Sequence, residues 1–274
     1  MPRLGVCSWS LRPASPADLA SKVRAVGISA VQLALDPLRE GAWGEHETLA
    51  ALEGITILSG MMGTKGEDYT TLDSIRATGG VVPDEHWEEN LARARANAAI
   101  AARLGVRLVT FHAGFIPHGE SPARRVLVDR IHAVADAFAA HGVDIALETG
   151  QEDAATLLAF LNELVRPSVG VNFDPANMIL YGMGDPMAAL AALAPRVRQV
   201  HIKDAIPGPA RGQWGAETPA GRGAVRWADF FGVAKSAGLL DRCDLVIERE
   251  SGDERIADCR TAAALARGLA PGIA

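Results

Sequence analysis

Strand-like and helix-like segments alternate along the whole sequence, and this alternation constrains the fold more than any other feature. Each short apolar run is followed by an amphipathic segment, and Ser15-Pro16 is a typical helix start, with a serine N-cap and a proline at the first helical position. Strands separated by helices predict a parallel sheet with right-handed crossovers. The expected strands are RLGVCS (3–8), SAVQLAL (29–35), ITILSG (55–60), VRLVTFHAG (106–114), VDIALETG (143–150), SVGVNFDP (168–175), VRQVHIKD (197–204) and CDLVIERE (243–250).

Eight such units in 274 residues predict an α/β fold of one domain over residues 1–274, a (β/α)₈ TIM barrel. The alternative is an open doubly wound sheet, which usually carries a G-x-G-x-x-G turn after its first strand. Here the first turn reads CSWSLRPAS and lacks those glycines, so the barrel is favoured. The expected helices cover about 16–26, 46–53, 84–104, 121–141, 153–164, 185–193, 226–237 and 253–268.

Two segments after strands are too long for plain connections. Residues 61–83 are expected to form a long loop with one short helix, and residues 205–225 a Gly/Pro-rich loop. Loops of this length in a compact domain are usually functional or disordered. In a barrel both would lie on the catalytic face, because both follow strands.

Composition narrows the possible classes of function. Hydrophobic residues make up 49% of the chain and the net charge is −6, which argues against a nucleic-acid or membrane-surface binder. The three cysteines, Cys7, Cys243 and Cys259, form no CxxC pair, as expected of buried thiols in a reducing compartment. The sequence shows no signal-peptide pattern and no run of 18 apolar residues, so a cytoplasmic location is expected.

Four ionisable side chains stand at or beside the ends of the last four strands: Glu148, Asp174, His201 and Glu248. Taken singly, such an aspartate could cap the following helix, and such a histidine could be a hydrogen-bonded core residue. Taken together, they would bring three carboxylates close to one another at the barrel mouth, which is costly unless a cation binds. Three carboxylates and one imidazole suit Mn²⁺, Co²⁺ or Mg²⁺, and the imidazole leaves Zn²⁺ open.

The motifs ALETG, NFDPANM, VHIKDA and VIERE resemble those of the xylose-isomerase-like TIM-barrel superfamily. The branch is that of the sugar (phosphate) isomerases and epimerases, which includes tagatose/psicose 3-epimerases, hydroxypyruvate isomerases and inosose-processing enzymes. The resemblance runs from GVCSWS through IERESG. It implies that Glu148, Asp174, His201 and Glu248 bind one divalent metal, and that Glu148 and Glu248 form the acid–base pair. The implied substrate is a small carbohydrate or keto-cyclitol, converted through an enediolate.

One position departs from the pattern of that superfamily. Many members carry a histidine three residues after the aspartate, where this chain has Asn177. Asparagine can hydrogen-bond a sugar oxygen, but it cannot carry a positive charge or transfer a proton. Related endonucleases use a trinuclear zinc site with several extra histidines and an Asp-x-His pair, which this chain lacks. Nucleic-acid chemistry is therefore not expected.

Further side chains are candidates for contact with the substrate. His112 ends the fourth strand, where substrate contact and core hydrogen bonding are equal readings. Lys203 should face the barrel mouth with His201 because strand residues alternate in direction. Trp9 and Trp43 follow the first two strands and could wall a sugar ring, although loop packing is an equal reading. The loop over 205–227 reads as a lid. The substrate-contact set is His112, Asn177, Lys203, Arg211, Glu217, Trp9 and Trp43.

The first hypothesis is thus a metal-dependent sugar isomerase or epimerase. The second is a dehydratase or lyase acting on an inosose or 3-keto-sugar with the same metal. A third, of another class, is a non-catalytic metal- or sugar-binding barrel, which would not need both glutamates. Relatives are often homo-oligomers, but the sequence shows no evident interface.

Overall fold

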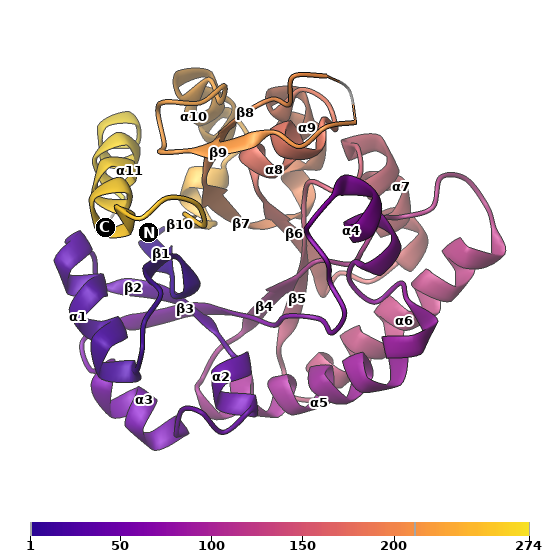
Figure 1. The fold of residues 1–274 in the computed structure, drawn as a ribbon, viewed down its shortest axis with the longest axis horizontal. Helices are drawn as coiled ribbons and strands as arrows, with labels where there is room; N and C mark the ends of the chain where they lie inside the picture. The colour runs from indigo at the N-terminus through magenta and orange to yellow at the C-terminus, as the bar shows by residue number, and fades with distance from the viewer. Residues whose placement is uncertain (1, 211, 274) are drawn as a thin grey trace.

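The computed structural model describes residues 2–210 and 212–273, and it confirms the (β/α)₈ barrel (Figure 1). Eight parallel strands close in the order β1-β10-β7-β6-β5-β4-β3-β2. Short strands with buried residues on both faces are typical of a parallel sheet covered by helices. The strands are β1 Leu4–Cys7, β2 Ala30–Ala34, β3 Thr56–Met61, β4 Leu108–Phe111, β5 Asp144–Glu148, β6 Val169–Phe173, β7 Val197–Ile202 and β10 Asp244–Ile247.

A ring of helices surrounds the barrel (Figure 1). The Ser15 side chain accepts a hydrogen bond from the backbone N–H of Asp18, which confirms the predicted N-cap. None of the described helices is long and apolar enough to cross a membrane. The outer helices are α1 Pro16–Val26, α3 Glu45–Ala51, α5 Trp87–Arg103, α6 Pro122–Ala139, α7 Ala154–Leu164, α9 Pro186–Leu193, α10 Trp227–Ser236 and α11 Arg255–Leu269.

Three short helices lie in the loops above the strand ends. They are α2 Asp36–Arg39, α4 Leu72–Thr78 and α8 Pro175–Tyr181. The short helix expected within 61–83 is α4. No helix was expected directly after Asp174, and this is a correction: Pro175 ends the strand and also occupies the first position of α8. The described residues also form four 3₁₀ turns: η1 Trp9–Leu11, η2 Asp84–His86, η3 Ala194–Arg196 and η4 Leu239–Asp241.

The Gly/Pro-rich segment 205–225 is also more ordered than expected. β8 (Asp204–Ile206) and β9 (Ala216–Thr218) pair antiparallel, and this β8–β9 hairpin rises above the ends of β7 and β10 (Figure 1). Asp204 is fully buried, and its carboxylate accepts five N–H groups, which hold the base of the hairpin on the barrel. The donors are the backbone amides of Ala205, Gly221, Gly223 and Val225 and the indole of Trp227.

The hydrophobic core fills the space between the strands and the outer helices, as the contact of Phe173 on β6 with Phe230 on α10 illustrates, with ring centroids 6.1 Å apart. The inside of the barrel is different, because a set of polar side chains replaces the branched aliphatic residues that usually fill it. We call this set the polar layer; every member is at most 1% exposed: Gln32, Ser59, Thr110, Asn172 and Gln199.

Candidate functional site

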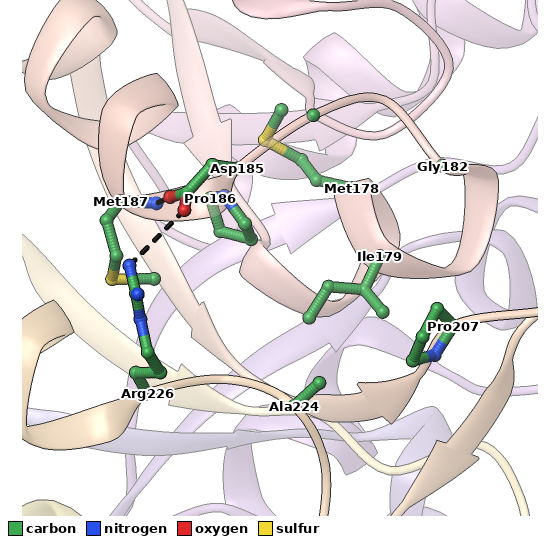
Figure 2. Close-up of a pocket in the computed structure, with 10 residues that line it drawn as sticks. Met178, Ile179, Gly182, Asp185, Pro186, Met187, Pro207, Ala224 and Arg226 are labelled. Carbon is green, nitrogen blue, oxygen red and sulfur yellow. Dashed lines mark hydrogen bonds and ion pairs between the residues drawn. The ribbon is translucent and has the colours of Figure 1, made fainter.

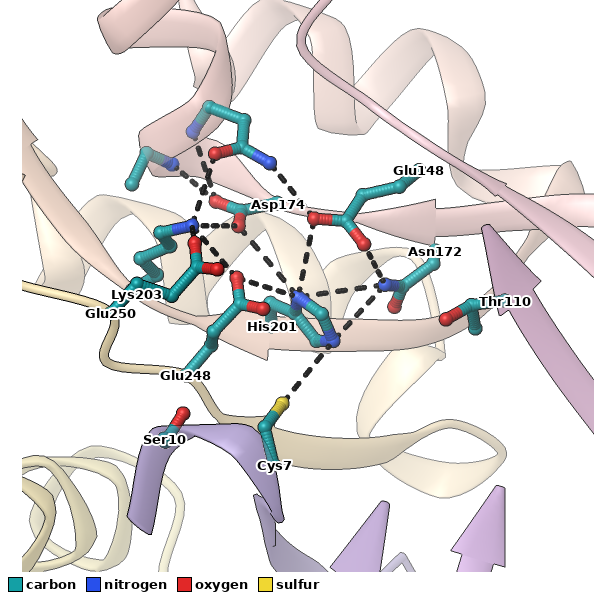
Figure 3. A network of polar contacts seen from close by, with 12 residues as sticks. Cys7, Ser10, Thr110, Glu148, Asn172, Asp174, His201, Lys203, Glu248 and Glu250 are labelled. Atoms are coloured by element: carbon teal, nitrogen blue, oxygen red, sulfur yellow. Dashed lines mark hydrogen bonds and ion pairs between the residues drawn. The ribbon is translucent and has the colours of Figure 1, made fainter. Parts of the chain in front are cut away.

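The structure brings the four predicted metal ligands together at the carboxyl ends of the strands (Figure 3). One ligand atom from each of Glu148, Asp174, His201 and Glu248 lies within 4.8 Å of the others. His201 Nδ1 is at the centre, 3.6 Å from Glu148 Oε1, 3.7 Å from Asp174 Oδ2 and 3.3 Å from Glu248 Oε2. All four side chains are buried. We refer to them as the ligand cluster.

Asp174 shows that its two sequence interpretations, helix cap and metal ligand, are compatible. Its Oδ1 accepts the backbone N–H groups of Ala176 at 2.7 Å and Asn177 at 3.0 Å, and so caps α8. Its Oδ2 is buried and has no hydrogen-bond partner among the described residues, although it faces His201. A buried carboxylate oxygen without a partner is costly, and a metal ion would satisfy it. The donor set therefore fits a divalent metal.

The charges of the ligand cluster perturb one another strongly. Burial raises the pKa of Asp174 to about 6. Burial alone would also raise the pKa of Glu248, but Lys203 and His201 hold that pKa well below its usual value. Burial would lower the pKa of His201, but Glu248 and Glu148 raise it well above the usual value. Among the protein groups alone, protonated His201 thus balances the carboxylates, and a metal ion would take over that role.

Lys203 and Asn177 lie directly beside the ligand cluster, as substrate-contact candidates should. The Lys203 ammonium is 2.8 Å from Glu248 Oε2 and 2.6 Å from Glu250 Oε2, and it donates to Asn177 Oδ1 at 3.2 Å. Asn177 Nδ2 in turn donates to Glu148 Oε1 at 2.8 Å. Asn177 therefore links the lysine to one of the two glutamates.

Trp9 and His112 stand on opposite sides of the barrel mouth, each next to one glutamate. Trp9 Nε1 donates to Glu248 Oε1 at 2.8 Å. His112 Nε2 lies 3.8 Å from Glu148 Oε1, and its ring is in edge contact with Tyr69 from the β3–α4 loop, with centroids 6.4 Å apart. Each of these two candidates is thus adjacent to one of the two glutamates.

The remaining three candidates are placed differently. Glu217, on β9, accepts from Arg249 Nη1 at 2.6 Å and from the backbone N–H of Glu250 at 2.9 Å, so it supports the segment after β10 instead of facing the ligand cluster. Trp43 packs against the hydrophobic core and shares no hydrogen bond with the cluster. Arg211 lies outside the described residues.

Sequence reasoning missed three residues that shape this site: Asp204, Glu250 and Tyr69. Asp204 holds the hairpin, and a Cβ on Gly223 would lie only 2.1 Å from Asp204 Oδ1. Gly223 was therefore the sequence signal for a close contact between this loop and Asp204. Glu250 is absent from the predicted site residues, yet its carboxylate accepts a hydrogen bond from the Lys203 ammonium. Tyr69 had no signal, because its contact with His112 joins two loops far apart in the chain.

A separate pocket of about 310 Å³ lies on the outer side of α8, between that helix, α9 and the hairpin (Figure 2). An ion pair between Asp185 and Arg226, 3.2 Å apart, crosses one end of it. Its remaining lining is mostly apolar, and no member of the ligand cluster lines it. This pocket is therefore distinct from the candidate site.

Comparison with known proteins agrees with this geometry. The family model for the xylose isomerase-like TIM barrel matches residues 20–269. The chain belongs to this family. No curated protein matches the sequence.

Among solved structures, a xylose isomerase domain protein from Planctomyces limnophilus is 33% identical, with a TM-score of 0.81 over 91% of this chain and 93% of that chain. The probable 3-DHS dehydratase AsbF from Bacillus anthracis is 18% identical, with a TM-score of 0.72 over 97% and 98% of the two chains. D-allulose 3-epimerase from Methylomonas sp. in complex with D-allulose is 17% identical, with a TM-score of 0.73 over 98% and 97%. At these low sequence identities, the last two similarities show a shared fold and nothing further.

Proposed function

We propose that this protein is a divalent-metal-dependent sugar isomerase or epimerase, with Glu148 and Glu248 as its acid–base pair. The observation that carries the proposal is the buried ligand cluster, in which Asp174 Oδ2 accepts no hydrogen bond from the described residues and only faces His201 and Lys203 at 3.7 and 3.8 Å. Glu148, Asp174, His201 and Glu248 would hold one ion, of Mn²⁺, Co²⁺, Mg²⁺ or Zn²⁺. The bound metal would supply an electrophile that stabilises negative charge on substrate oxygen.

The positions of the two glutamates suit proton transfer on two faces of a substrate. Removing a proton from the carbon next to a carbonyl gives an enediolate, and returning a proton to another face or another carbon gives the epimer or the isomer. Glu148 ends β5 and Glu248 follows β10, with β6 and β7 between them in the barrel. Their carboxylates therefore approach from different sides. Asn177 orients Glu148, and Trp9 with Lys203 orients Glu248.

A dehydratase is the second candidate, and the placement of His112 favours it. Eliminating a hydroxyl group next to an enediolate needs one further acid near the leaving group. His112 lies beside Glu148 and could serve, and one fold relative carries the name of a dehydratase. A non-catalytic binding barrel is less well supported, because both glutamates are oriented by hydrogen bonds that mere metal binding does not require.

The decisive experiment is deuterium exchange from D₂O into a panel of ketoses, keto-cyclitols and 3-keto-sugars, followed by mass spectrometry. An isomerase or epimerase incorporates deuterium at unchanged heavy-atom composition, whereas a dehydratase yields a product lighter by one water. Glu148→Gln and Glu248→Gln should abolish exchange, and exposed Glu53→Gln is the matched control. Absence of exchange with every substrate and each of the four metals would refute the proposal.

A further inference from the structure

The polar layer inside the barrel has no role in the function proposed so far. Its side chains lie deeper in the barrel than the ligand cluster, and they form a continuous hydrogen-bonded network. Ser59 Oγ donates to Gln199 Oε1 at 2.5 Å. Gln199 Nε2 donates to Asn172 Oδ1 at 3.2 Å and to Gln32 Oε1 at 3.0 Å. Gln32 Nε2 in turn donates to Thr110 Oγ1 at 2.8 Å. A buried network of this kind is costly unless satisfied, so it calls for an explanation.

The network touches the ligand cluster at two points. Asn172 Nδ2 donates to Glu148 Oε2 at 3.1 Å, a contact drawn in Figure 3. Gln32 Oε1 lies 2.8 Å from His201 Nε2, on the side of the ring away from the carboxylates. Glu148 and His201 are thus each held by one side-chain amide of the polar layer.

The orientation of the Gln32 amide is set by its other partners. Gln32 Nε2 faces the backbone carbonyl of Gly60 at 3.4 Å, and a carbonyl can only accept. Gln32 Oε1 faces the Gln199 amide nitrogen, which can only donate. Turning the amide over would place two donors against each other on one side and two acceptors on the other. Oε1 therefore points at His201 in either charge state of the ring.

An oxygen at 2.8 Å from His201 Nε2 requires a proton on that nitrogen. Asn172 Nδ2 also lies 3.0 Å from Nε2, but it donates one hydrogen to Glu148 Oε2 at 3.1 Å. An unprotonated Nε2 would instead set its lone pair against Gln32 Oε1 at the shorter distance of 2.8 Å. With Nε2 protonated, the lone pair of the neutral imidazole lies on Nδ1. Nδ1 is the atom that faces Glu148, Asp174 and Glu248.

We infer that Gln32 is a positioning residue for the metal centre: its side-chain oxygen holds the Nε2–H tautomer of His201 and so presents Nδ1 to the ion. The inference rests on the proposed metal site, but it concerns a residue to which no role has been given. Partners that fix the free ring nitrogen of a ligating histidine typically contribute 10- to 100-fold to metal affinity. Gln32 supplies this contact from β2, which β1 and β10 separate from β7 in the barrel.

The test measures metal affinity and the tautomer independently. Gln32→Met removes the amide while keeping the chain length, and the Kd for Zn²⁺ by calorimetry is expected to rise about 10- to 100-fold. Gln32→Glu keeps an acceptor oxygen and should restore most of the affinity. Ser59→Ala is the matched control, because it removes a hydrogen bond from the same layer without touching Gln32 or His201. A Kd within twofold of wild type in Gln32→Met would overturn the inference.

Nitrogen-15 NMR of wild-type protein with ¹⁵N-labelled histidine provides the second arm, which does not depend on how any variant folds. The Zn²⁺-loaded protein is expected to show His201 with a protonated Nε2 and a metal-shifted Nδ1. A protonated Nδ1 in the neutral ring would refute the role of Gln32 even if the metal binds. If wild-type protein binds no metal, the proposed function fails, and the tautomer measured at high pH without metal still decides the positioning contact.

Discussion

The side-chain amide of Asn177 donates from Nδ2 to Oε1 of Glu148 at 2.8 Å, while its oxygen accepts from Lys203. Asn177 thus bridges a candidate acid–base residue and the only lysine that contacts the ligand cluster in the described part of the chain. Many superfamily members have a histidine at this position. The amide keeps a neutral donor against Glu148 and at the same time leaves an acceptor for the ammonium.

This bridge predicts a graded response to substitution at position 177. Asn177→Ala removes the hydrogen bond to an ionised group, which typically costs about 1.5–3 kcal/mol, or roughly 10- to 100-fold in kcat. Asn177→Asp should be more damaging, because it places a second carboxylate next to Glu148. The measurement is the kcat of deuterium exchange with circular dichroism as a check on folding. Asn162→Asp, on the exposed side of α7, is the control, and equal activity of all three variants would contradict the assigned role.

Lys203 gives a second prediction, which concerns metal binding. Its ammonium lies against Glu248 Oε2, an oxygen that also faces His201 Nδ1. Lys203→Met leaves an uncompensated buried carboxylate, which typically costs about 3–5 kcal/mol of stability. A bound divalent ion offsets that cost. The Tm of metal-free protein should therefore fall much more than the Tm of metal-loaded protein, and the metal Kd should tighten.

Thermal unfolding with and without Mn²⁺ measures the first effect, and calorimetry measures the second. Lys235→Met, at an exposed position of α10, serves as the control for losing a lysine. A Tm loss of the same size in both metal states would show that Lys203 has no electrostatic coupling to the metal site.

Asp174 illustrates how much of this site could be predicted from sequence. A buried run that ends in a charged residue directly before a proline marks a strand end, and the alternation of strand side chains places successive inward residues two apart. Together with the alternation of strands and helices, which predicts the barrel, those two regularities suffice for the convergence of the four ligand candidates. They depend only on local spacing along strands, which a single sequence records well.

The rest depends on contacts between distant loops, which local patterns do not record. The hairpin after β7 exists because Asp204 collects N–H groups from residues up to 23 positions away. Trp43 and Trp9 looked alike as aromatic residues after strands, yet only Trp9 reaches a glutamate. Two members of the polar layer, Asn172 and Gln199, stand in the sequence two residues before Asp174 and His201. The role of the layer depends on Gln32 on β2, which the sequence pattern does not connect to them.

Glu152 gives a prediction about stability and pH. It lies buried in the loop between β5 and α7, and burial, with Asp153 nearby, raises its pKa from 4.5 to about 8. The folded protein therefore retains a proton that the unfolded chain releases above pH 4.5. The free energy of unfolding should fall as the pH rises from 4.5 to about 8 and then level off. Between these pH values, this group lowers the free energy of unfolding by at most about 1.4 kcal/mol per pH unit.

Glu152→Gln removes that dependence, since a neutral amide occupies the same volume. Urea unfolding should show the variant more stable than wild type by a few kcal/mol at pH 8 and similar to wild type at pH 4.5. Exposed Glu120→Gln should show no such pH-dependent difference. A constant offset between Glu152→Gln and wild type across this range would mean that Glu152 is ionised in the folded protein.

The charge of the site predicts an uncharged substrate. The described cations beside the ligand cluster are already paired: Lys203 with Glu248 and Glu250, and Arg249 with Glu217 and Asp258. The proposed metal ion would be engaged by the reacting oxygens of the substrate, so a phosphate or carboxylate elsewhere on the substrate would meet carboxylates without an unpaired described cation. Such mismatches cost at least about 1.4 kcal/mol, or tenfold in kcat/KM. Neutral ketoses or keto-cyclitols should therefore exceed their phosphates by at least that factor in the exchange panel. Arg211→Ala should leave the ratio unchanged, and a preference for the phosphate that Arg211→Ala abolishes would refute this prediction.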